Sequence, residues 1–187
     1  MKAVLTSIQP YYVFLIIARI MGWNIPQAKT IEVRKDFPKD PAWNRCVYIY
    51  CSKNKKSFKR IPKQFQSCMK KLLGKVIGEF VCDSIRKGRA DNAIAAYFHN
   101  DPEETCLTDR ELVLYANLEK PLYFWHISDL KIYDKPKELG EFYKVGKRKA
   151  CIYGDKTCIY SRTTDFCKKC EFEIKSPPQS WRYVEGI

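Results

Sequence analysis

The chain has 187 residues, of which 45% are hydrophobic and 14% aromatic, a composition that excludes a disordered chain and favours one domain with a single main core. Its 34 lysines and arginines outnumber its 21 acidic residues, which gives a formal net charge of +13. Such a charge attracts polyanions, and nucleic acid is the commonest polyanion in cells. A lysine-rich surface that only keeps the protein soluble is the alternative explanation.

The first twenty residues predict a strand followed by a buried helix. Residues 2–6 are strand-like, and Pro10 is typical of the first turn of a helix, which we expect over residues 11–21 with Gly22 as its stop. The apolar run in this helix is interrupted by Arg19 and is shorter than the ~20 residues that span a bilayer. We therefore expect no membrane segment and no contact with a membrane.

The segment KTIEVRK, residues 29–35, alternates strictly between polar and apolar side chains from Thr30 to Arg34. This period of two predicts a strand with Ile31 and Val33 on one face. The opposite face carries Thr30, Glu32 and Arg34. A desolvated lysine such as Lys29 can serve as a base or nucleophile, and an arginine offers a planar fork for phosphate or a base edge. The alternative is a half-exposed strand whose charges neutralise each other in water.

Further elements follow along the chain. Strands are predicted at 46–51 and 74–85, with a lysine-rich helix at 62–73 between them. The sequence TDRE at 108–111 matches a capping box and predicts the start of a helix. The aromatic segment 122–133 is strand-like, and a last strand is expected at about 181–184. Short strands with few helices predict an α+β fold, a twisted and barrel-like β core flanked by helices.

Nine cysteines occur in a chain without a convincing secretory signal, which favours reduced thiols and a cytoplasmic location. Four of them form the spacing C-x6-C-x8-C-x2-C: Cys151, Cys158, Cys167 and Cys170. This spacing is able to surround one tetrahedral zinc ion, which would stabilise a stretch with few apolar residues to bury. Plain buried thiols are the alternative for these four, and we expect the other five to be small buried hydrophobes.

Several segments together resemble one known family. KAVLTSIQP and KTIEVRK resemble the start of an ASCH (activating-signal-cointegrator homology) domain of the PUA-like superfamily, and GKVIGEFVCD, YFWHISDLKIY and PPQSWRYVE are similar to later core strands of its bacterial and phage members. The resemblance implies a single α+β domain over residues 1–187, a PUA-like twisted β pseudo-barrel flanked by helices. The Cys-rich part at 150–171 is then an extension before the last strand. The implied function is binding of RNA or a modified nucleoside in a basic cleft.

Some ASCH proteins are enzymes that remove the acetyl group from acetylated cytidine. In these amidohydrolases a lysine, a threonine three positions later and a separate glutamate are assigned to catalysis. Lys29 matches the lysine, but Glu32 stands where the threonine is expected. Candidates for the separate glutamate are Glu103, Glu104 and Glu111. The resemblance therefore leaves an amidohydrolase or a ribonuclease that uses Lys29 and Glu32 as an alternative to a binding module.

We expect ligand-binding residues to come from the N-terminal strands and from the aromatic segment 122–133. The predicted set is Ser7, Lys29, Thr30, Glu32, Arg34, Lys35, Trp125 and His126. Trp125 or Tyr123 offers a stacking surface for an unpaired base, and His126 an acid or base near neutral pH. The alternative for all three is an ordinary core position. Basic residues cluster at 53–63, 86–89 and 144–149, and we expect surface lysines to hold the phosphate backbone. A third hypothesis is a protein-interaction domain for an acidic partner.

Overall fold

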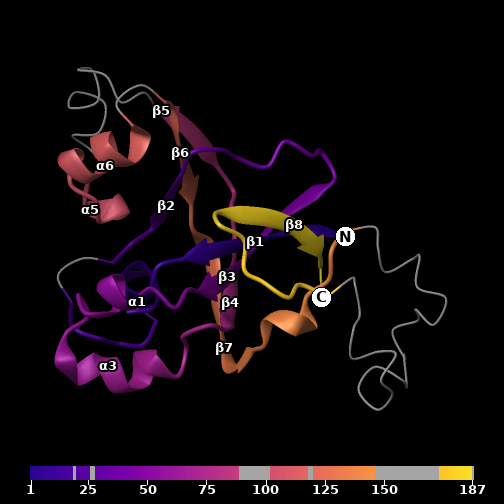
Figure 1. The fold of residues 1–187 in the computed structure, drawn as a ribbon. Coiled ribbons are helices and arrows are strands. Elements are labelled where there is room, and N and C mark those ends of the chain that lie inside the picture. Colours follow the sequence, from indigo (N-terminus) through magenta and orange to yellow (C-terminus); the bar gives the residue numbers. More distant parts are fainter. Residues whose placement is uncertain (19, 26–27, 89–101, 118–119, 146–172, 187) are drawn as a thin grey trace, which may run out of the picture.

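A computed structural model describes residues 1–18, 20–25, 28–88, 102–117, 120–145 and 173–186. These residues form two β-sheets that the helices flank (Figure 1). The first sheet has the order β7 (Ser128–Lys137), β4 (Val76–Val81), β3 (Trp43–Cys51), β1 (Lys2–Ile8) and β8 (Trp181–Glu185). The second has the order β2 (Ile31–Arg34), β6 (Leu122–His126) and β5 (Ile85–Gly88). The α+β class predicted from the sequence is confirmed, and the described strands form two sheets instead of a closed barrel.

The chain passes directly from the second sheet to the first between β6 and β7. β1 and β3 pair in parallel, whereas all other named pairs are antiparallel. The chain leaves the second sheet at His126 and enters the first at Ser128. Between them, the N–H of Ile127 donates to the carbonyl of Thr30 at 2.8 Å. The segment predicted as one strand, 122–133, is therefore two strands that change partners at Ile127.

In the described part of the chain, six short helical elements flank the sheets. They are α1 (Pro10–Ile17), α2 (Lys55–Phe58), α3 (Lys63–Lys70), α5 (Pro102–Thr105), α6 (Asp109–Ala116) and the 3-10 turn η1 (Leu139–Glu141). Pro10 occupies the first turn of α1 as predicted, but this helix ends at Ile17, and the chain turns before Gly22, whose φ is 65°. The predicted capping box is present, because the side chains of Thr108 and Glu111 each accept from the other's backbone N–H, at 3.2 and 3.0 Å.

The main core lies between the first sheet, α1 and the inner face of the second sheet. Trp125 is fully buried there, with its ring centroid 6.2 Å from that of Trp43 and 6.1 Å from that of Trp181. A second, smaller cluster packs α6 against β2 and β6 and includes Ile31 and Val33. No helix among the described residues is long and apolar enough to cross a membrane.

The five described cysteines are free thiols with different environments. Cys51 and Cys82 are buried, and burial raises the pKa of each thiol to about 12. Cys68 is exposed on α3, so the expectation of a buried thiol is wrong at this position. The four candidate zinc ligands, Cys151, Cys158, Cys167 and Cys170, lie outside the described residues. The zinc site stays a prediction.

Candidate functional site

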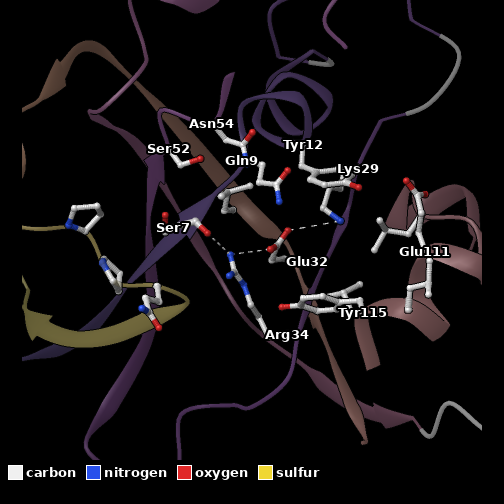
Figure 2. A pocket seen from close by; sticks show the side chains of 17 residues that line it. Ser7, Gln9, Tyr12, Lys29, Glu32, Arg34, Ser52, Asn54, Glu111 and Tyr115 are labelled. Atoms are coloured by element: carbon white, nitrogen blue, oxygen red, sulfur yellow. Dashed lines mark hydrogen bonds and ion pairs between the residues drawn. The ribbon is translucent and has the colours of Figure 1, made fainter. Parts of the chain in front are cut away.

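A pocket of about 800 Å³ opens where the two sheets and two helices meet. Its wall is formed by the end of β1, the start of α1, strand β2, helix α6 and the residues 177–179 that precede β8 (Figure 2). These segments are far apart in the sequence. The polar side of β2, which the period-two pattern singles out, faces this hollow.

Three charged side chains stand in the wall of the pocket and are almost completely buried. Lys29, Glu32 and Arg34, here called the buried trio, have side chains exposed by only 2%, 8% and 6%. One oxygen of Glu32 lies 3.6 Å from Lys29 Nζ, and the other lies 2.8 Å from an Nη atom of Arg34. Figure 2 shows the carboxylate between the two cations. Alternation along β2 explains why Glu32 and Arg34 project together.

Backbone carbonyls complete the contacts of the two cations. Lys29 Nζ donates to the carbonyl of Thr105 at 2.7 Å, and Arg34 Nη2 donates to the carbonyl of Ser7 at 2.8 Å. Burial lowers the pKa of Lys29, and the carboxylate of Glu32 opposes this effect. When all three groups are charged the trio carries a net charge of +1. This favours an anionic or hydrogen-bond-accepting ligand at this wall.

Two buried polar atoms of the pocket residues lack a partner. Among the described residues, nothing accepts a hydrogen bond from Arg34 Nε, and nothing bonds to the hydroxyl of Ser52. Both residues line the pocket. An unsatisfied buried donor costs roughly 1–3 kcal/mol.

Aromatic rings flank the charged wall. Tyr12 at the start of α1 and Tyr115 near the end of α6 both line the pocket. Lys29 Nζ lies 5.3 Å from the centroid of the Tyr12 ring, and Lys35 Nζ lies 4.9 Å from that of Tyr115. Glu111 adds a second carboxylate on the α6 side. Flat aromatic surfaces beside charged hydrogen-bonding groups suit a planar, polar ligand such as a nucleobase.

No protein-family model and no curated protein matches this sequence. Solved structures do match it: the ASCH protein from Zymomonas mobilis aligns at 15% identity and a TM-score of 0.53, over 98% of this chain and 87% of that one. Its serine-to-alanine mutant aligns at 15% identity and a TM-score of 0.55, over 98% of this chain and 88% of that one. Its tyrosine-to-phenylalanine mutant aligns at 16% identity and a TM-score of 0.53, over 99% of this chain and 91% of that one. The chain has an ASCH-type fold.

The ASCH-type fold brings together half of the predicted ligand residues. Ser7, Lys29, Glu32 and Arg34 all line the pocket. The other four do not: Thr30, Lys35, Trp125 and His126. Trp125 fills the core, and Lys35 is exposed outside the pocket, above the Tyr115 ring.

The last two predicted residues have local roles. Thr30 supports the second sheet through its backbone, donating to the carbonyl of Glu104 at 2.9 Å. His126 is half-exposed and pairs through Nδ1 with Asp83 at 2.7 Å. Of the three glutamates proposed from the family resemblance, Glu111 lines the pocket. Glu104 contributes a backbone carbonyl to Thr30, and the side chain of Glu103 lies outside the described structure.

Sequence reasoning missed the aromatic part of this site. Tyr12 and Tyr115 were not singled out, and neither were Ser52, Asn54 or the segment 177–179. One signal was available for Tyr12, because a pair of tyrosines opens a helix whose following residues are all apolar and buried. The remaining residues come from segments whose meeting depends on the tertiary fold.

Proposed function

We propose that the protein binds RNA or a modified nucleoside, with one nucleobase held in the pocket. The observation that carries the proposal is the buried trio in the wall of a hollow flanked by Tyr12 and Tyr115. A tyrosine ring stacks on any base, the carboxylate of Glu32 accepts from an exocyclic amine, and the positive charge of Arg34 attracts a carbonyl or phosphate oxygen. The net charge of +13 draws a polyanion toward this site.

Replacing Tyr115 with alanine should weaken binding of single-stranded RNA by about 5- to 150-fold, because base stacking on an aromatic ring contributes about 1–3 kcal/mol. Fluorescence anisotropy with labelled RNA measures the change. For the wild type we expect a Kd of about 10⁻⁴ to 10⁻⁶ M or lower at physiological salt. The Kd should rise steeply as the salt concentration rises.

Tyr123→Ala is the matched control, because Tyr123 is half-buried on β6 and does not line the pocket. Its ring packs against that of Phe37, with the two ring centroids 4.7 Å apart. Equal losses in the two variants would contradict a role of Tyr115 in the site. Absence of binding at low salt, or binding that is indifferent to salt, would remove the proposal.

A second candidate function is hydrolysis of an acylated nucleoside. It is favoured by Lys29, because burial lowers the pKa of this amine and a carboxylate lies 3.6 Å away. As a neutral amine, Lys29 would take a proton from water while the water oxygen attacks the acyl carbon. The amide C–N bond then breaks, the proton passes to the leaving nitrogen, and the free nucleoside and a carboxylic acid are formed.

Lys29→Met should lower turnover of acetylated cytidine by about 10²- to 10⁴-fold if this reaction occurs, the usual contribution of a general base. Chromatography of cytidine released from acetylcytidine gives the rate, and the same variants incubated with RNA test for cleavage. Lys39→Met is the control, since the Lys39 side chain is 71% exposed, pairs with Asp36 on the surface and does not line the pocket. Equal turnover in wild type and Lys29→Met would show that the trio is not catalytic.

A further inference from the structure

An arginine beside the pocket is held by aromatic and polar contacts while its side chain stays partly exposed. The Cζ atom of Arg60, just after α2, lies 4.0 Å from the centroid of the Tyr11 ring. Its Nη1 atom is 3.4 Å from the hydroxyl of Tyr12 and 3.6 Å from a carboxylate oxygen of Glu111. The side chain is nevertheless 44% exposed. These contacts fix the guanidinium without enclosing it.

The partners of Arg60 place it beside the proposed nucleobase site. Tyr12 and Glu111 both line the pocket, one from α1 and the other from α6. Arg60 bridges these two walls at the outer edge. A guanidinium plane is a stacking surface for an unpaired base, as an aromatic ring is. The next base of a strand would therefore find a flat, positive surface directly outside the pocket.

The sequence segment that contains Arg60 is basic over its whole length. The segment 53–71, which contains α2 and α3, has no acidic residue. Its exposed lysines are Lys53, Lys55, Lys56, Lys59, Lys63, Lys70 and Lys71. Within the described part of the chain, none of these lysines forms an ion pair with a carboxylate. Unpaired lysines in a row are the usual contacts for successive phosphates.

We propose that the ligand is a single strand of RNA: one nucleotide enters the pocket, its neighbour stacks on Arg60, and the following phosphates lie along the lysines of segment 53–71. This inference rests on the proposed function and adds the class of ligand to it. A free nucleoside leaves Arg60 and the lysines unused. A duplex leaves no unpaired base for either position, and an acidic protein meets the lysines but gains little from a flat guanidinium.

Binding of an RNA octamer should be at least about tenfold tighter than binding of any ribonucleoside monophosphate. Arg60→Lys keeps the charge but removes the plane, so we expect it to weaken octamer binding by about 5- to 150-fold and to weaken monophosphate binding much less. The triple variant Lys55→Gln, Lys56→Gln and Lys59→Gln should reduce the slope of log affinity against log salt by about 2, because each lost phosphate contact of a single strand contributes about 0.7.

The control is the triple variant Lys131→Gln, Lys135→Gln and Lys175→Gln, which removes three exposed lysines outside this surface and should leave the salt slope unchanged. Melting temperatures verify that all variants are folded. An octamer that binds no tighter than a monophosphate overturns the inference while the pocket proposal stands. Equal binding of a glutamate octapeptide or a duplex also overturns it. Absence of binding by octamer and monophosphates alike removes both proposals.

Discussion

Replacing Glu32 with glutamine should lower the free energy of unfolding by about 3–5 kcal/mol, because two buried cations then lose their carboxylate. Lys29 and Arg34 are both at least nine-tenths buried, and the only carboxylate that either contacts in the described structure is that of Glu32. The glutamine keeps the shape of the side chain but not its charge. Urea unfolding followed by tryptophan fluorescence measures the loss.

Asp36→Asn is the matched control for charge removal. Its carboxylate pairs with Lys39 at 3.6 Å, but the side chains are 56% and 71% exposed, and such surface pairs contribute less than about 1 kcal/mol. Similar losses in the two variants would contradict the structural role of the trio. The control also excludes a general effect of net charge, because each variant removes one negative charge.

The stability of the Glu32→Gln variant should depend on pH through Lys29. Burial lowers the pKa of Lys29 below its ordinary value of 10.5, and the nearby carboxylate limits that decrease. Between the lowered folded pKa and 10.5 the unfolded chain binds more protons than the folded chain, so stability gains with rising pH. Without the carboxylate this window extends to lower pH. The deficit of the variant relative to wild type should therefore shrink as pH rises toward 10.5.

Trp125→Ala is expected to destabilise the fold by about 3–5 kcal/mol, the usual cost of emptying a tryptophan site in a core. Trp125 is fully buried and packs between Trp43 and Trp181. Trp125→Phe should cost less, because most of the ring is kept and no described residue accepts a hydrogen bond from the indole nitrogen. Calorimetry or urea unfolding gives both values.

Trp125→Phe also tests whether this residue serves the ligand. A folded Trp125→Phe protein should bind RNA with wild-type affinity, since Trp125 does not line the pocket. If the Trp125→Phe variant lost RNA binding while its stability was unchanged, Trp125 would be shown to take part in ligand binding. Leu114→Ala provides a reference for unfolding, because Leu114 is 63% exposed and its truncation should change stability by less than about 0.5 kcal/mol.

The local alternation of polar and apolar residues was sufficient to predict the charged half of the candidate site. Period-two alternation in residues 29–35 placed Glu32 and Arg34 on one side, and that side faces the pocket. Alternation did not separate core from site in β6, because Phe124 and Trp125 are neighbours with opposite directions and both are buried. A strand covered on both faces carries no such signal.

The other elements and pocket residues could not be predicted from local sequence patterns, because the elements are too short or the residues come from distant segments. α2 and α5 have only four residues each, which is too short for a helical period to be visible. Tyr115 reaches the pocket only because α6 packs on β2 and β6, and Ser52 only because β3 pairs with β1. Residues 177–179 complete the wall because β8 adds to the edge of β1. Tertiary contacts bring these residues together, and secondary-structure propensity does not predict such contacts.

Because residues 177–179 form part of its wall, the pocket is completed late in the synthesis of the chain. Ser180 accepts from the N–H of Ser7 at 2.9 Å and lies 3.5 Å from the guanidinium of Arg34, which precedes it by 146 positions. At about 5–20 residues per second, the ribosome needs roughly 7–30 s to add that stretch. A nascent chain has one side of the hollow open throughout this interval. The pocket is therefore complete only after translation has passed the last strand.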